Sequence, residues 1–412
     1  HRLFAPARLI NPINDRFGYT VTGGYSDNYS PAPLALYRWH GAWAATGNTA
    51  NFPQTTPDRP YATNYALRDG AKSTERISFG TTFDYRLGDY DRISAGLQYS
   101  YFDLISTDQT ITFTINRVAS QTGTTTVGAV GQGEVVRNNL VRHRTNRTVH
   151  PTLVWYHHGP EWTWKAGLGY SRGQNFNKDR ANGAFNTATA SMSNVTITLA
   201  DNTYLRPGQI TVLDNAPGAV GVPLDPFALS DRYALSVADF NEDQVESVHL
   251  TAYADATRDF TWPMPVEIKA GLRFEGLSKE NERGFARYNY LGNAGNRSPA
   301  AFLDEVYASR PGQLGFPSIQ GIDNYKLHAH LVANPGQFQL NAPGEYFNRV
   351  NSSRDASEDI AAGYVQAGVK FLDRRLHLVG GFRVEHTMID SNGPLTDPTG
   401  NYQRDTQGNI VL

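Results

Sequence analysis

The sequence predicts an all-β protein whose antiparallel strands run up and down a single wall. Three observations predict this fold. Many segments alternate apolar and polar side chains with a period of two, these segments come in pairs joined by short turns, and long irregular segments separate the pairs. All short turns then share one rim of the wall and all long loops share the other. That arrangement is typical of an up-and-down transmembrane β-barrel.

The composition excludes several classes of protein. The 412 residues include no cysteine, which excludes a disulfide framework, a thiolate metal site and a cysteine nucleophile. The formal net charge of −2 gives no electrostatic reason to expect a nucleic-acid partner. No run of about 18 apolar residues exists, so a transmembrane helix is excluded. A membrane-spanning strand needs only about ten residues with every second one apolar, and the chain contains many segments of this kind.

The clearest hairpin lies within residues 360–390. Both halves alternate, and the turn falls at residues 372–375. One face of the hairpin is apolar, and the other carries Lys, Arg, Glu, His and Gln. Pairing the strands about the turn sets these residues opposite one another: Phe371 and Leu376, Val369 and Leu378, Val365 and Phe382, Tyr364 and Arg383, Ala362 and Glu385.

The same pattern predicts about nine strands in all. In chain order they are 17–25, 77–87, 93–101 with an extension toward 115, 149–155, 162–170, 248–256, 266–274, 361–371 and 376–384. Pro151 removes a ladder hydrogen bond, which predicts a bulge or a local break in its strand. Aromatic residues gather near the short turns (Tyr85, Trp155, Trp162, Trp164, Phe260) and toward the loops (Tyr99, Tyr101, Tyr170, Phe274), as the interfacial girdles of a membrane barrel would require.

Long loops are expected at residues 27–73, 116–143, 173–243 and 277–358. A sheet of about nine strands in a bilayer would leave unpaired backbone groups at two edges, each costing several kcal/mol. The wall is therefore expected to be part of a larger barrel, about nine of 22 strands. On this interpretation residues 1–412 form one partial barrel domain with no plug domain.

Short motifs in two of the hairpins point to a family. Ala362-Gly-Tyr-Val-Gln366 is followed by Arg375-Leu-His-Leu-Val-Gly-Gly-Phe-Arg-Val-Glu385, and Gly271-Leu-Arg-Phe-Glu275 is a second copy of the last phrase. In these motifs the chain resembles the β-barrel part of TonB-dependent outer-membrane receptors. The resemblance implies a 22-strand barrel with short periplasmic turns and long extracellular loops, in the outer membrane of a Gram-negative bacterium.

The same resemblance implies function and partners. Such receptors capture scarce siderophore, cobalamin, glycan or peptide ligands for uptake that TonB energises from the inner membrane. The expected partners are outer-membrane lipid, a plug domain, TonB and the ligand, with no nucleic acid. No plug and no TonB-binding segment is recognisable in the sequence, so this chain is expected to supply wall and ligand-capturing loops.

Two groups of residues are candidate ligand contacts. Trp39 and Trp43 in the first long loop offer stacking surfaces of the kind that bind sugars or aromatic chelates, although packing of loop against loop explains them too. Arg273, Tyr364 and Arg383 fall on the polar face of their strands. They are expected to contact a ligand or a plug, although a ladder of mutual ion pairs along a wet lumen is an equal explanation.

Neither an enzyme nor a resident cofactor is predicted. The chain has no Gly-x-Ser-x-Gly elbow, no HExxH motif and no P-loop. His328 and His330 would point to one side if their segment were extended, but no third ligand accompanies them, so no metal site is predicted.

Two other functions remain open. A passive outer-membrane porin would share the barrel and lack the plug. A surface or soluble β-sandwich used for adhesion or glycan binding would also alternate, and it would bury the Val, Leu and Phe faces beneath a second sheet.

Overall fold

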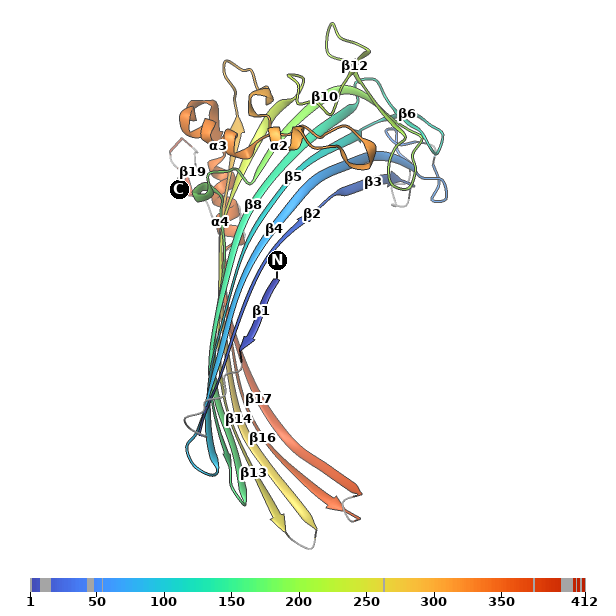
Figure 1. Ribbon diagram of the computed structural model, residues 1–412. Coiled ribbons are helices and arrows are strands. Elements are labelled where there is room, and N and C mark those ends of the chain that lie inside the picture. The colour runs from blue at the N-terminus through green and yellow to red at the C-terminus, as the bar shows by residue number, and fades with distance from the viewer. Residues whose placement is uncertain are drawn as a thin grey trace.

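A computed structural model describes residues 2–7, 16–42, 48–53, 55–261, 264–372, 375–393, 403–404, 406–407 and 410–411. It contains one antiparallel sheet of 17 strands and a separate two-stranded pairing of β18 with β19. In Figure 1 the large sheet forms a tall curved wall, with the short turns at one end and the helices at the other.

The strands of the sheet are β1 (Arg2–Ala7), β2 (Phe17–Pro31), β3 (Leu34–His40), β4 (Tyr61–Arg86), β5 (Asp91–Ile115), β6 (Val118–Gln121), β7 (Thr126–Gly128), β8 (Gly133–His158), β9 (Trp162–Lys178), β10 (Thr187–Ala200), β11 (Gln209–Asp214), β12 (Val222–Leu224), β13 (Ala234–Thr261), β14 (Pro265–Tyr290), β15 (Phe338–Leu340), β16 (Arg354–Phe371) and β17 (Leu376–Asn392). The separate pair is β18 (Gln403–Arg404) and β19 (Ile410–Val411). The helices are α1 (Asp179–Asn182), α2 (Glu305–Ala308), α3 (Asn324–Ala333) and α4 (Ala342–Ser352), with short 3₁₀ turns η1 (Ala300–Phe302), η2 (Gln313–Gly315) and η3 (Pro335–Gln337).

The wall follows the up-and-down order that the sequence predicts. The strands of the wall lie side by side in the order β1, β2, β4, β5, β8, β9, β13, β14, β16 and β17, and each is antiparallel to the next. Two further strands extend the wall at the loop end. β3 pairs with β4 beyond the end of β2, and β10 lies between β8 and β13 beyond the end of β9. The nine predicted strands are all present, and β1 precedes them.

The register of the last hairpin confirms the pairing expected from its alternation. Phe371 lies opposite Leu376, Val365 opposite Phe382, and Tyr364 opposite Arg383. The break expected at Pro151 is also present. The β8–β9 ladder runs from Val149 straight to Thr152 in unchanged register, so the proline interrupts pairing on that side without a bulge.

The strands are longer than predicted, and the four loop boundaries are therefore wrong. β13 has 28 residues, and β4 and β8 have 26 each, against about ten needed to cross a membrane. Residues 27–73 include β3 and ends of β2 and β4, and 116–143 includes β6, β7 and the start of β8. Residues 173–243 include α1, β10 to β12 and ends of β9 and β13, and 277–358 includes β15, helices α2 to α4 and ends of β14 and β16. Hydropathy misses these extensions because polar residues such as Asp69 and Glu75 occupy apolar-face positions between the belt and the loop end and interrupt the alternation.

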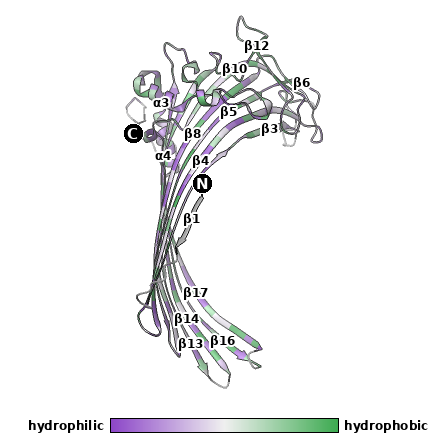
Figure 2. Cartoon of the chain, in the orientation of Figure 1, coloured by the Kyte–Doolittle hydropathy of each residue, from purple (hydrophilic) through white to green (hydrophobic). Residues whose placement is uncertain are grey.

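The two faces of the sheet differ along its whole width. We define the apolar face as the one that carries Phe79, Leu153, Leu168, Leu272 and Phe382, and the polar face as its reverse. Because the long ladders keep constant register, cross-strand partners share a face and residues two apart share it too. The alternation of green and purple along each strand shows this sorting (Figure 2).

Near the short turns and at mid-height the apolar face is uncovered. Leu272 keeps 69% of its surface exposed, and Phe382 keeps 83%. No second sheet lies over these residues in the described part of the chain. The β-sandwich alternative is thereby contradicted, since it requires these side chains to be buried beneath a second sheet.

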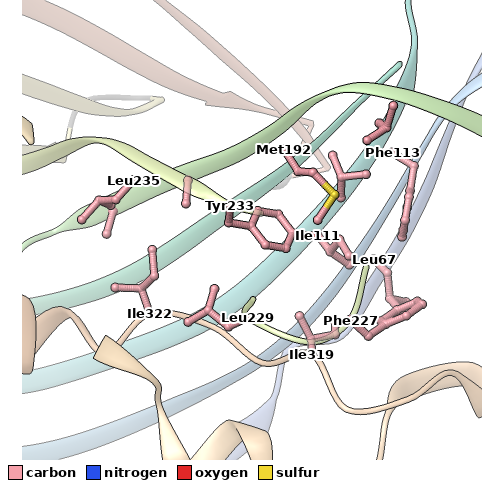
Figure 3. Packing of buried hydrophobic residues seen from close by; sticks show 14 of the residues in the cluster. Leu67, Ile111, Phe113, Met192, Phe227, Leu229, Tyr233, Leu235, Ile319 and Ile322 are labelled. Carbon is pink, nitrogen blue, oxygen red and sulfur yellow. The ribbon is translucent and has the colours of Figure 1, made fainter. Parts of the chain in front are cut away.

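At the loop end, a cap covers the same apolar face. We define the cap as residues 225–233 and 299–340. The cap buries Phe227, Leu229, Tyr233, Ile319 and Ile322 against side chains of the sheet. Figure 3 shows these residues packed on Leu67, Ile111, Phe113, Met192 and Leu235.

Polar contacts fasten the cap to the sheet. Arg137 of β8 is fully buried, and its Nη2 donates to the carbonyl of Pro226 at 2.6 Å. Tyr233 Oη donates to the same carbonyl at 2.7 Å. At the other end of the cap, Asn324 Nδ2 donates to the carbonyl of Phe185 at 2.9 Å. The long connections are thus folded structure on one face of the wall, where the sequence predicted irregular loops.

Candidate functional site

A row of polar side chains crosses four strands of the polar face. Asp255 of β13 pairs with Gly271 of β14, which pairs with Tyr364 of β16, which pairs with Arg383 of β17. Tyr364 Oη donates to Asp255 Oδ1 at 2.6 Å and therefore reaches past β14. A Cβ on Gly271 would lie 2.5 Å from Tyr364 Cε1, so only glycine leaves room for this crossing.

Two arginines beside this row are held by glutamates on their own strands. Arg383 Nη2 donates to Glu385 at 2.6 Å, and Arg273 Nε donates to Glu275 at 2.5 Å. Residues two apart on a strand share a face, so the repeated Gly-x-Arg-x-Glu phrase builds the same polar pair twice. These fixed guanidinium groups present planar donors that suit carboxylate or phosphate.

The structure brings three of the predicted ligand contacts together and separates the fourth. Arg273, Tyr364 and Arg383 all lie on the polar face within adjacent register positions. Trp39 lies at the loop end on β3 and packs against the buried cluster beneath the cap, with its ring centroid 4.9 Å from that of Tyr37. Trp43 lies outside the described residues.

The paired histidines do not share a side. His328 and His330 lie in helix α3, so two residues turn the second imidazole by about 200° from the first, and the expectation based on an extended segment was wrong. His328 packs near Phe240 at 5.5 Å, whereas His330 Nε2 is 2.9 Å from Gln337 Oε1. In the part of the chain that the structure describes, no group of three or more His, Cys, Asp and Glu residues is placed to hold a metal ion.

The polar face also carries a neutral band that the sequence analysis did not single out. A hollow of about 540 Å³ lies on it, and its lining includes Thr22, Ser78, Gln98, Ser100, Thr148 and His150. Hydroxyl and amide groups of this kind form hydrogen bonds without charge. Serine and threonine at every second position could have revealed the band, because each of its strands had already been predicted.

The apolar face is arranged in zones along each strand. Tyr85, Trp155 and Trp164 lie near the short turns, followed by an aliphatic belt. On β9 the segment from Trp162 to Tyr170 is about 26 Å long at about 3.3 Å per residue, and its nine residues are the length of strand that a tilted membrane-spanning strand needs. Small side chains open a groove of about 710 Å³ in this belt, lined by Leu153, Trp155, Ala166, Leu168, Ala252, Leu272 and Phe274 among others.

A polar network lies on the apolar face between this belt and the cap. Arg172 forms two hydrogen bonds of 2.8 Å with Glu246, and Gln174 donates to the same carboxylate at 2.6 Å. His143 Nε2 lies 2.7 Å from Asp103 Oδ1 on the neighbouring strands. Charged side chains directly beyond an apolar band mark the height at which a membrane barrel leaves the hydrocarbon.

Among the described residues, no helix is both long and apolar enough to cross a membrane. A search of the curated proteins finds no match to the chain. A family model described as TonB dependent receptor-like, beta-barrel matches residues 193–410, which is more than half of the chain. The wall, its exposed apolar belt and this match agree. The chain therefore belongs to the TonB-dependent receptor β-barrel family, a family of transport receptors of the Gram-negative outer membrane.

Proposed function

We propose that this chain forms wall of an outer-membrane receptor that captures a scarce ligand for TonB-energised uptake. The ligand would be of the siderophore, cobalamin, glycan or peptide class. The observation that carries the proposal is the sorting of side chains across a wall of ten long antiparallel strands, with an exposed apolar belt on one face and ion-paired side chains on the other. A membrane barrel needs both faces.

On this proposal the apolar face contacts lipid and the polar face contacts the interior. The aromatic rings near the turns and near Tyr170 support this sidedness, because amphipathic rings favour the headgroup boundary. The cap then lies on the outside of the wall beyond the membrane. Its buried aromatic cluster stabilises the long strands where lipid no longer covers them.

Arg273, Tyr364 and Arg383 are the ligand or plug contacts that we propose. Each is fixed by a carboxylate on the polar face, so the row is preorganised and polar at the height of the apolar belt. Trp39 is a weaker candidate because its ring is engaged with Tyr37 on the opposite face. A plug domain and TonB would be the protein partners, as the family implies.

Uptake measurements test the proposal directly. Cells with and without the protein would be offered a labelled ferric chelate, cobalamin, an oligosaccharide and a peptide, each with and without a protonophore. The proposal predicts uptake of one of them that requires both the protein and the proton gradient. Uptake that persists in the protonophore would support a passive porin instead, and the absence of the protein from the outer membrane would contradict both.

A further inference from the structure

On β4 and β14, charged side chains in the loop-end half of the wall are sorted by sign between the two faces, whereas β8 and β9 also carry cations, such as Arg147 and Arg172, on the apolar face. On β4, the cations Arg68, Lys72 and Arg76 point to the polar face, whereas the acids Asp69 and Glu75 point to the apolar face. The cations occupy even-numbered positions of the strand and the acids occupy odd-numbered positions, and successive side chains of a strand point to opposite faces. A strand with water on both sides would have no reason to separate them.

The same sorting recurs on β14, far from β4 in the sheet. Within Lys279-Glu-Asn-Glu-Arg283, Lys279 and Arg283 are on the polar face and Glu280 and Glu282 are on the apolar face. β8 adds Arg142 and Arg144 to the polar face. Observed contacts agree with these assignments, since Arg283 Nε lies 3.5 Å from Asp243 Oδ1, another residue of the polar face.

The cations of the polar face form one continuous band. Lys72 pairs across the ladder with Ser106, which pairs with Arg142. Arg144 is joined to Arg283 through Asn177 and Asp243 in successive ladders. At about 4.8 Å per strand, the band spans about 24 Å from β4 to β14. We define the basic band as Lys72, Arg76, Arg142, Arg144 and Arg283.

The carboxylates near the basic band do not cancel its charge. Asp108, Asp179 and Asp243 are the acids of the polar face that lie beside it, three against five cations. Arg142 Nε is buried and has no hydrogen-bond partner among the described residues. Lys72, Arg76 and Arg283 are exposed. The band therefore keeps positive charge and free donors.

We infer that the basic band is the first capture site for an anionic ligand, one that carries carboxylate, phosphate or sulfate groups. This inference rests on the proposed function, because that function makes the polar face the interior of the receptor. Guanidinium groups bind such anions through paired hydrogen bonds, and a surface with excess positive charge attracts them. The amides and hydroxyls between the cations, including Asn146, Asn175, Asn177 and Ser106, supply further neutral contacts.

Below the band, the polar face changes from excess positive charge to neutral and then to ion-paired side chains. The neutral hollow that includes Ser78, Ser100 and Thr148 follows directly along β4, β5 and β8. The row of Tyr364 and Arg383 follows at the turn end. An anion would thus meet excess positive charge first and compensated charge later, so its electrostatic attraction to the polar face is strongest at the basic band.

Binding of a trisulfonated pyrene dye to the purified protein tests the inference. The triple variant Lys72→Gln, Arg76→Gln, Arg283→Gln removes three exposed cations of the basic band. The matched control Arg147→Gln, Arg172→Gln, Lys178→Gln removes three cations from the apolar face of the same strand region. The expected result is at least about tenfold weaker dye binding for the first variant and less than about twofold change for the control.

The unmodified protein supplies a second readout that needs no variant. Dye affinity should fall steeply with salt, and a cationic dye of similar size should not compete. Equal weakening in the two triple variants, or dye binding that salt does not change, would overturn the inference. A polar face that soluble reagents cannot reach would instead contradict the proposed function, so the two failures are distinguishable.

Discussion

Tyr364 and Asp255 are joined by a 2.6 Å hydrogen bond although a whole strand lies between them. The bond exists because Gly271 leaves the space above β14 empty. It links the side chains of β13 and β16 across β14, in addition to the ladders that each of them forms with β14. In the Gly271 copy of the Gly-x-Arg-x-Glu phrase, the glycine makes room for the Tyr364 ring, and in both copies the arginine bonds the glutamate.

Substitution Gly271→Ala should weaken the wall by about 1–3 kcal/mol, because the new methyl group meets the ring of Tyr364. The temperature at which the folded barrel loses its compact mobility on a gel measures this. In a Tyr364→Ala background the same substitution should cost less, since the ring is gone. An equal loss of stability in both backgrounds would show that Gly271 is not needed to make room for the Tyr364 ring.

Substitution Leu272→Arg should destabilise the protein by about 2–4 kcal/mol, because it places a charge in the hydrocarbon. Thr251→Arg is the matched control, as Thr251 lies in the neighbouring strand on the polar face. It should cost less than about 1 kcal/mol. Unfolding in denaturant from lipid vesicles compares the two variants, and equal effects would contradict the assigned faces.

Substitution Arg137→Ala should release the cap while the wall persists. Arg137 is fully buried and donates to the carbonyl of Pro226, so its loss removes this hydrogen bond and leaves a cavity, at a cost of about 2–4 kcal/mol, although Tyr233 still donates to the same carbonyl. Limited proteolysis should then cut within residues 225–233. Arg172→Ala, an exposed change, should leave the cap resistant. A cap that resists in both variants would show that this contact does not hold it.

Asp179 should make stability depend on pH. Its side chain is buried and accepts a hydrogen bond from the backbone of Asn241, and burial raises the pKa of Asp179 to about 7. The folded protein therefore binds this proton more tightly than the unfolded chain does. Stability should fall as pH rises from about 4 to about 7 and then level off, by at most about 4 kcal/mol.

Thermal melting of the Asp179→Asn variant checks this dependence. The neutral amide can still accept from Asn241, so the variant should be more stable than the unmodified protein by a margin that grows between pH 5 and pH 8. A difference in melting temperature that stays constant between these two pH values would contradict the assignment to Asp179.

The alternation of single side chains predicted the register of the hairpin, down to Tyr364 opposite Arg383. It did not predict strand ends, because Asp69, Ser73 and Glu75 place polar side chains on the apolar face of β4 and interrupt the alternation before the buried loop end. The cap could not be predicted from the sequence for a different reason. Its contacts, such as Arg137 with Pro226, join residues far apart in the chain, and no local pattern reports them.

The sequence predicted only part of the candidate site, because hydropathy alternates in some of its segments and not in others. Arg273, Tyr364 and Arg383 lie where hydropathy alternates strongly, and the structure places them together on the polar face. Arg142 and Arg283 fall in segments that were expected to be loops, so their shared face could not be recognised. Charges that change sign at alternate positions, as in Lys279-Glu-Asn-Glu-Arg283, are the pattern from which the longer strands could have been predicted.

Fluorescence quenching at two adjacent positions tests the sidedness of the wall most directly. The chain has no cysteine, so Leu272→Cys and Arg273→Cys can each carry one environment-sensitive dye. In membranes, nitroxide on lipid acyl chains should quench the dye at 272 and spare the dye at 273, while a water-soluble quencher should do the reverse. Quenching of both positions by the soluble reagent, or of neither by the lipid, would contradict the account.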